Sequence, residues 1–76
     1  MPRDAALRLS TVSVVDALAA SLRDRVLDGQ IPPGSTMTEA EIASTYGVSR
    51  PTARSALTAL VHEGLLYREA NTRACV

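Results

Sequence analysis

The sequence predicts a mainly α-helical fold in which three helices are followed by a small β-hairpin. Two observations carry this prediction. Apolar residues recur at helical spacing in three segments, and a glycine closes each segment: Gly29, Gly47 and Gly64. After Gly64, two short runs of strand-forming residues flank Asn71, a residue suited to a tight turn. A chain of 76 residues, 46% of them hydrophobic, has room for one domain with a small core.

Composition excludes several classes of protein. One cysteine, Cys75, and one histidine, His62, cannot form an internal disulfide or a closed zinc site. The longest stretch without a charge, residues 29–38, contains two prolines and is too short to span a membrane. The N-terminus has no apolar signal-peptide region. We therefore expect no cofactor, no metal, no membrane partner and a cytoplasmic location.

The first helix is expected over residues 13–28. Residues 1–12 lack sustained periodicity and predict a flexible N-terminal arm that precedes a domain over residues 13–76. Ser13, with Asp16 three places later, resembles an N-cap. The following apolar residues recur at helical spacing: Val15, Leu18, Leu22 and Val26.

The second and third helices are joined by a short glycine turn. Thr38 and Glu41 form a capping-box pattern that starts the second helix, and Gly47 ends it. Ser49 caps a third helix over residues 50–63. One buried stripe follows on that helix: Ala53, Ala56, Leu57, Leu60 and Val61. Two short helices with a tight turn between them are typical of a helix-turn-helix.

The exposed face of the third helix has the composition of a DNA-reading surface. Arg50 and Arg54 are four residues apart and share one side of the helix near its N-terminus. No carboxylate occurs between Glu41 and Glu63. Arginines can bind guanine edges or phosphates, and a helix N-terminus favours an anion. The alternative is that both arginines are ordinary solvated surface.

The charge distribution separates the two halves of the chain. Eight arginines balance eight carboxylates, which argues against a nucleic-acid partner if the chain is taken as a whole. Residues 1–41 hold four arginines and six carboxylates, for a net charge of −2, whereas residues 42–76 hold four and two, for +2. The positive half contains the third helix and the hairpin.

Residues 14–76 resemble the N-terminal winged helix-turn-helix domain of GntR-type bacterial transcription regulators. The matching stretches are LRDRVLDGQIPPGS, TEAEIASTYGVSRPTARSAL and LVHEGLLYR, in that order along the chain. The resemblance implies a three-helix winged helix-turn-helix, with the third helix in the major groove. The hairpin, residues 65–76, would be the wing on the adjacent backbone or minor groove.

The resemblance also implies a two-fold symmetric homodimer on a double-stranded, palindromic DNA operator. We expect the DNA contacts to come from Thr38, Ser49, Arg50, Thr52, Arg54, Asn71 and Arg73. Family members carry a larger C-terminal domain that binds a small-molecule effector and makes most of the dimer interface. That domain would start where this sequence stops, at Val76, so effector binding is expected outside these residues.

Two other functional classes compete with DNA binding. A winged helix can serve as a protein-interaction module without DNA binding. The neutral net charge favours this alternative, and so does the altered wing, which has Arg73 where the family commonly has glycine and Cys75 where it commonly has an aromatic residue. An enzyme is disfavoured, because the chain has no nucleophile–base pair, phosphate-binding glycine run or metal cluster. We expect no catalytic residue.

Overall fold

A computed structural model describes residues 3–70 and 73–76 of the chain, with side chains described for residues 14–69 and 73–76. The described residues form three helices and one three-stranded antiparallel sheet, which confirms the predicted fold class. In chain order the elements are α1 (Arg3–Leu27), β1 (Thr36–Thr38), α2 (Glu39–Tyr46), α3 (Arg50–His62), β2 (Tyr67–Ala70) and β3 (Arg73–Cys75). Within these residues, no helix is both long and apolar enough to cross a membrane.

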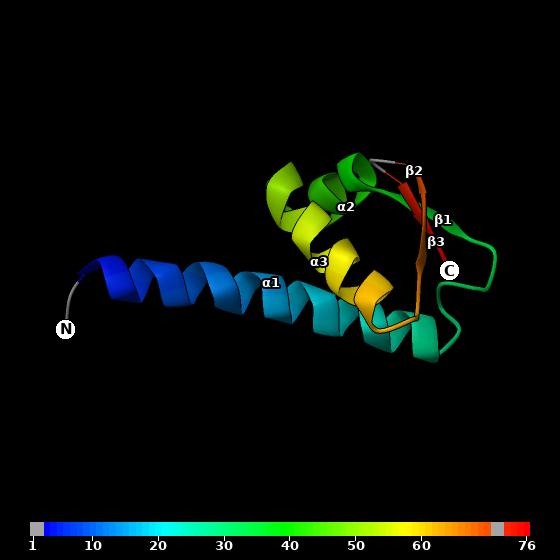
Figure 1. Cartoon of the computed structure of the whole chain (residues 1–76), viewed down its shortest axis with the longest axis horizontal. Coiled ribbons are helices and arrows are strands. Elements are labelled where there is room, and N and C mark those ends of the chain that lie inside the picture. Colours follow the sequence, from blue (N-terminus) through cyan, green and yellow to red (C-terminus); the bar gives the residue numbers. More distant parts are fainter. Residues whose placement is uncertain (1–2, 71–72) are drawn as a thin grey trace.

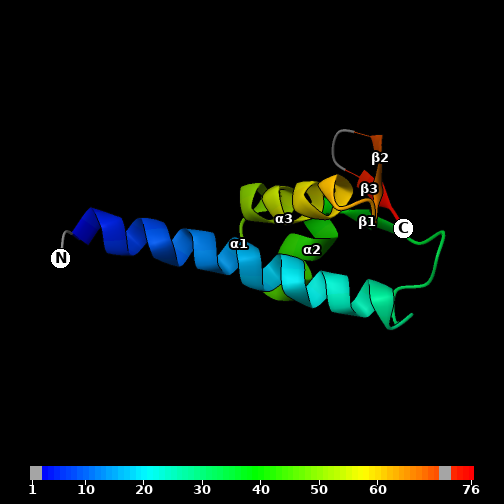
Figure 2. The ribbon, with the colours of Figure 1, turned by 60° about the horizontal axis from the view of Figure 1, so that its bottom comes forward.

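The first helix is longer than predicted. α1 is continuous over 25 residues from Arg3, so the predicted start at Ser13 is wrong and residues 3–12 are its first turns. Such a helix is about 37 Å long. Its C-terminal half packs on the body of the domain, whereas its N-terminal half extends past it (Figures 1 and 2). The flexibility expected of residues 1–12 stays a prediction.

The end of α1 follows the predicted pattern. Gly29 has φ +81°, the left-handed conformation that closes a helix, and its N–H donates to the Val26 carbonyl at 3.2 Å. The Ile31 N–H then donates to the Arg25 carbonyl at 3.1 Å, which folds the chain back beside the last turn. These bonds satisfy carbonyls that the helix end would otherwise leave without partners.

The helix-turn-helix is built from local capping. Thr38 Oγ1 accepts from the Glu41 N–H at 3.1 Å and starts α2, and Gly47, at φ +66°, ends it. Only Gly47, Val48 and the cap Ser49 separate α2 from α3. Because the turn is this short, α2 and α3 pack directly against each other. α3 also packs against α1 (Figure 1).

The sheet has the strand order β1-β3-β2, so β3 is the central strand although it comes after the other two in the chain. Thr36 pairs with Cys75 and Thr38 with Arg73, while Tyr67 pairs with Cys75 from the other side. A register irregularity lies between Arg68 and Ala70 in β2. The hairpin strands were predicted, but β1 was not. By pairing with β3, β1 joins the wing to the start of α2.

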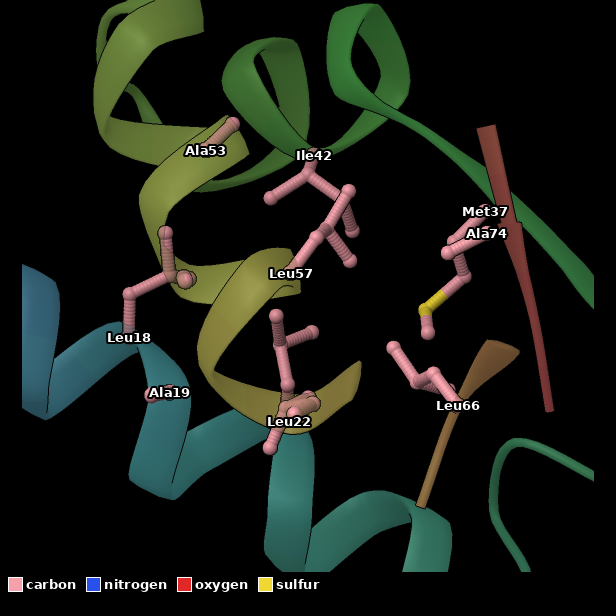
Figure 3. Packing of buried hydrophobic residues seen from close by; sticks show 11 residues of the cluster. Leu18, Ala19, Leu22, Met37, Ile42, Ala53, Leu57, Leu66 and Ala74 are labelled. Carbon is pink, nitrogen blue, oxygen red and sulfur yellow. The ribbon is translucent and has the colours of Figure 1, made fainter. Parts of the chain in front are cut away.

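The core lies between α1, α3 and the inner face of the sheet (Figure 3). α1 and α3 each contribute side chains that are completely or nearly inaccessible to solvent, and α2 contributes Ile42. The buried apolar residues are Leu18, Ala19, Leu22, Met37, Ile42, Ala53, Ala56, Leu57, Leu60, Leu66, Ala74 and Cys75. Four of the five residues in the predicted α3 stripe are among them, and Val61 is half-buried. The opposite face of α3 is therefore the one that solvent reaches.

Candidate nucleic-acid interface

The first turn of α3 carries a pair of linked hydroxyl groups. Ser49 Oγ accepts from the Thr52 N–H at 3.2 Å, and the Ser49 hydroxyl donates to Thr52 Oγ1 at 2.9 Å. Ser49 is thus the N-cap, as predicted. Because Thr52 donates through its backbone and accepts through its side chain, its hydroxyl hydrogen remains available for an acceptor outside the helix.

Arg50 and Arg54 both lie on the exposed face of α3. They line a hollow of about 410 Å³ together with Glu39, Pro51 and Ser55. Arg50 makes no ion pair with the residues that the structure describes, whereas Arg54 pairs with Glu39. The two guanidiniums beside the hollow therefore differ in how firmly the described part of the protein holds them.

Glu39 was not predicted to belong to this surface. It is the first residue of α2, only 4% exposed, and its Oε2 accepts from Arg54 Nε at 2.9 Å. The hydrogen bond with Glu39, and then the charge of that carboxylate, raise the pKa of Arg54 above the usual arginine value. The sequence has no carboxylate between Glu41 and Glu63, but in the folded domain the carboxylate of Glu39, from α2, lies beside α3.

Arg68 approaches the same carboxylate from the wing. Its Nη2 donates to Thr58 Oγ1 on α3 at 2.7 Å, and its Nη1 lies 3.8 Å from Glu39 Oε2. Nη1 is buried and has no hydrogen-bond acceptor among the described residues. Arg68 therefore connects β2 to α3 instead of projecting from the wing.

Thr38 lies where β1 meets α2, and it is half-buried. Besides capping α2, its hydroxyl donates to Glu41 Oε1 at 2.9 Å. The hydroxyl hydrogen of Thr38 is therefore already used inside the protein, in contrast to that of Thr52. A DNA contact through the Thr38 side chain would require this bond to open.

Of the two predicted wing residues, Asn71 and Arg73, the structure describes Arg73. Arg73 begins β3 and is exposed, with Nε 3.6 Å from Glu69 Oε2 on the neighbouring strand. Asn71 lies outside the described residues. Arg73 is thus the described wing arginine that faces solvent, since Arg68 is turned toward α3.

The other side chains with possible chemistry, His62, Cys75 and Tyr46, do not form a common site within the described residues. His62 is exposed at the end of α3, and Cys75 is buried in β3. Tyr46 is half-buried, and the Arg25 guanidinium lies 5.4 Å from the centre of its ring. Over the described part of the chain, no three His, Cys, Asp or Glu side chains gather where they could hold a metal ion.

Comparison with known proteins places this geometry in a family. The sequence profile of the bacterial regulatory proteins of the gntR family matches residues 14–76. The chain is 37% identical over 60 residues to the HTH-type transcriptional repressor NagR of Bacillus subtilis (strain 168), covering 78% of this chain and 25% of that protein. It is 39% identical over 54 residues to an HTH-type transcriptional regulator of Mycobacterium tuberculosis, and the match covers 70% of this chain and 22% of that protein. The chain thus spans about a quarter of the length of the curated relatives it matches.

The fold matches a solved structure as well. A crystal structure of a GntR-family transcriptional regulator superposes with a TM-score of 0.74 at 31% identity, over 83% of this chain and 25% of that one. The region that the family profile matches includes both the helix-turn-helix and the wing. This chain therefore belongs to the gntR family of bacterial regulatory proteins.

Proposed function

We propose that this domain binds double-stranded DNA sequence-specifically, as the DNA-reading part of a bacterial transcription regulator. The observation that carries the proposal is the exposed start of α3, where Arg50 and Arg54 flank one hollow and Thr52 offers a hydroxyl hydrogen. Cationic and hydroxyl donors at a helix N-terminus suit phosphates and guanine edges. Relatives described as an HTH-type repressor and an HTH-type regulator support the same function.

In the proposed complex, α3 enters the major groove and the wing lies on the adjacent backbone or minor groove. A helix with its side chains is about 10–12 Å wide, and the major groove of B-DNA is about 12 Å wide. Arg54 reads a base edge, whereas Arg50 and Thr52 bind phosphates near the start of the helix. The other contacts come from Thr38, Ser49, Asn71 and Arg73.

The proposed assembly is a homodimer of a longer regulator on a palindromic operator. Residues 13–76 form its DNA-binding domain, and a C-terminal domain binds the small-molecule effector. A single domain binds one half-site and lacks the gain in effective concentration that a tethered second copy supplies. The regulator works in the cytoplasm and acts by binding rather than by catalysis.

Selection of bound sequences from random double-stranded DNA tests the function directly. We expect the 76-residue chain to enrich a short half-site, and the full-length regulator to enrich two such sites in inverted orientation. The distance between their centres reports the dimer geometry. Recovery of random sequence from both proteins would contradict sequence-specific binding.

Substitution of the two arginines tests the surface. Arg50→Ala and Arg54→Ala are each expected to weaken binding of the selected DNA by roughly 1–3 kcal/mol. Arg25→Ala is the matched control, because it removes the same charge from α1, where Arg25 stacks on Tyr46. The control should retain the affinity of the unsubstituted domain, as measured by fluorescence anisotropy.

The salt dependence separates DNA binding from the protein-interaction alternative. Removal of one phosphate-binding side chain is expected to reduce the slope of log affinity against log salt by about 1. Arg50→Ala should lower the slope by this amount, whereas Arg25→Ala should not. A partner protein that binds with little salt dependence, together with an absence of DNA selection, would favour the alternative.

A further inference from the structure

Glu39 lies under the proposed reading surface, at the point where α2, α3 and the wing meet. It is 4% exposed, although it is a carboxylate in a domain with a small core. Its place in the first turn of α2 helps to stabilise the negative charge, because that end of a helix is electropositive. Its partners are the guanidiniums of Arg54 on α3 and Arg68 on β2.

The way in which Arg54 is held leaves its outer edge available. Glu39 takes the Nε–H, at 2.9 Å, which is the donor nearest the aliphatic part of the side chain. The two terminal Nη groups carry the other four N–H donors of the guanidinium. The Arg54 side chain is still 57% exposed, and it lines the hollow beside Arg50. Two parallel N–H groups are what the O6 and N7 atoms of guanine accept in the major groove.

Arg68 keeps this arrangement cationic. Two guanidiniums share one carboxylate, so the Glu39–Arg54–Arg68 cluster carries a net charge of +1. Arg68 is itself anchored to Thr58 through Nη2. Glu39 thus orients Arg54 without cancelling the positive charge of the surface.

We propose that Glu39 is a positioning residue for sequence readout: it holds Arg54 by Nε so that the Nη edge is presented to a guanine. This inference rests on the proposed DNA binding and deepens it, because it assigns the chemistry of one base contact. It also separates the two arginines of α3. Arg54 is pre-oriented and reads a base, while Arg50, which has no ion pair within the described residues, supplies charge.

The test is a double-substitution cycle of Glu39→Gln and Arg54→Ala on the selected half-site and on its single-base variants. The glutamine side chain keeps the shape of glutamate but lacks its charge. We expect E39Q to weaken binding of the selected site roughly tenfold, within the range of one good bidentate base contact. E39Q should lose discrimination between guanine and the other bases at the same position of the half-site at which R54A loses it.

Three comparisons show whether Glu39 acts through Arg54. In the R54A background E39Q should change affinity less than about twofold, whereas with R50A the two effects should multiply, as for independent sites. Affinity for random DNA should stay unchanged or rise, since E39Q removes a negative charge. Glu39→Asp, which keeps the carboxylate, should recover part of the discrimination.

Several results would overturn the inference. Equal weakening on every sequence, or persistence of the E39Q effect in the R54A background, would assign Glu39 to the fold alone. Tighter binding of the selected site by E39Q would mean that Glu39 weakens the contact of Arg54 with DNA instead of positioning it. Thermal unfolding of each variant identifies any loss of folded protein. Failure of the proposed function looks different, because the unsubstituted domain itself would then show no preferred sequence.

Discussion

Arg23 on α1 and Glu63 at the end of α3 form a two-point ion pair, although 40 residues separate them in the chain. Arg23 Nε donates to Glu63 Oε1 at 2.6 Å and Nη2 donates to Oε2 at 2.7 Å. The planar guanidinium matches both carboxylate oxygens. The pair fixes the end of the proposed recognition helix against the long helix beneath it.

This ion pair predicts the titration of one carboxyl group. The hydrogen bond from Arg23, opposed by partial burial and aided by the arginine charge, lowers the pKa of Glu63 below its ordinary value of 4.5. The stability that the pair supplies is present above that ordinary value and is lost as the pH falls through the lower, folded-state pKa. NMR titration of the Glu63 side-chain carboxyl should show the lowered pKa.

The control for this titration is Arg23→Gln. In that variant the pKa of Glu63 is expected to return toward 4.5. The side chains of the two partners are 35% and 38% exposed, so solvent and salt screen the pair. An unchanged Glu63 pKa in R23Q would assign the shift to another cause.

Replacement of Leu57 tests the core. Leu57 on α3 is completely buried, and Figure 3 shows its side chain pointing toward that of Ile42. Leu57→Ala should lower the free energy of unfolding by roughly 2–5 kcal/mol, because it removes buried apolar atoms and leaves a cavity. Val14→Ala, at an exposed position of α1, should change it by less than about 0.5 kcal/mol. Urea unfolding measures both, and similar losses would refute the assigned core.

Gly47 gives a test of backbone conformation alone. Its φ is +66°, and a Cβ built on it meets no heavy atom within 4 Å. Gly47→Ala should therefore destabilise the domain by roughly 1–2 kcal/mol through left-handed strain rather than through a clash. Gly47→Asn should be less harmful, because asparagine adopts this conformation more readily. Chemical denaturation would distinguish them, and an alanine variant as stable as glycine would contradict the strain.

Ser49 separates stability from DNA binding. Ser49→Ala removes the cap of α3 and should cost roughly 0.5–2 kcal/mol of stability. Ser49→Asp can still cap the helix, so the melting temperature should stay near that of the unsubstituted domain. The new carboxylate would face the proposed phosphate site, and DNA affinity should fall. If the Ser49→Asp variant binds DNA with normal affinity, Ser49 does not contact DNA.

Local signals in the sequence were sufficient for the helix-turn-helix. The caps Thr38 and Ser49 and the turn glycine Gly47 act within a few residues of their own positions, so each could be predicted from its neighbours. The start of α1 could not be predicted by the same criterion. Periodicity detects a helix through apolar residues at helical spacing, whereas residues 3–12 lack that spacing and continue α1 past the body of the domain.

The missed features depend on partners that are distant in the chain. β1 has three residues, and only its pairing with β3 makes it a strand. The burial of Glu39 depends on Arg54 and Arg68, which approach it from two other elements. The sequence could therefore indicate which face of α3 is exposed, but not that a carboxylate from α2 lies on it.

The central position of β3 sets an order of assembly. β1 and β2 each pair with β3, so neither can complete its pairing until that strand leaves the ribosome. Thr36 then pairs with Cys75, which lies 39 positions later in the sequence, and such a long-range closure is slow compared with helix formation. The three helices can associate before this step. Until β3 arrives, the edges of β1 and β2 that pair with it have no partner strand, and the nascent domain is most prone to aggregation at that stage.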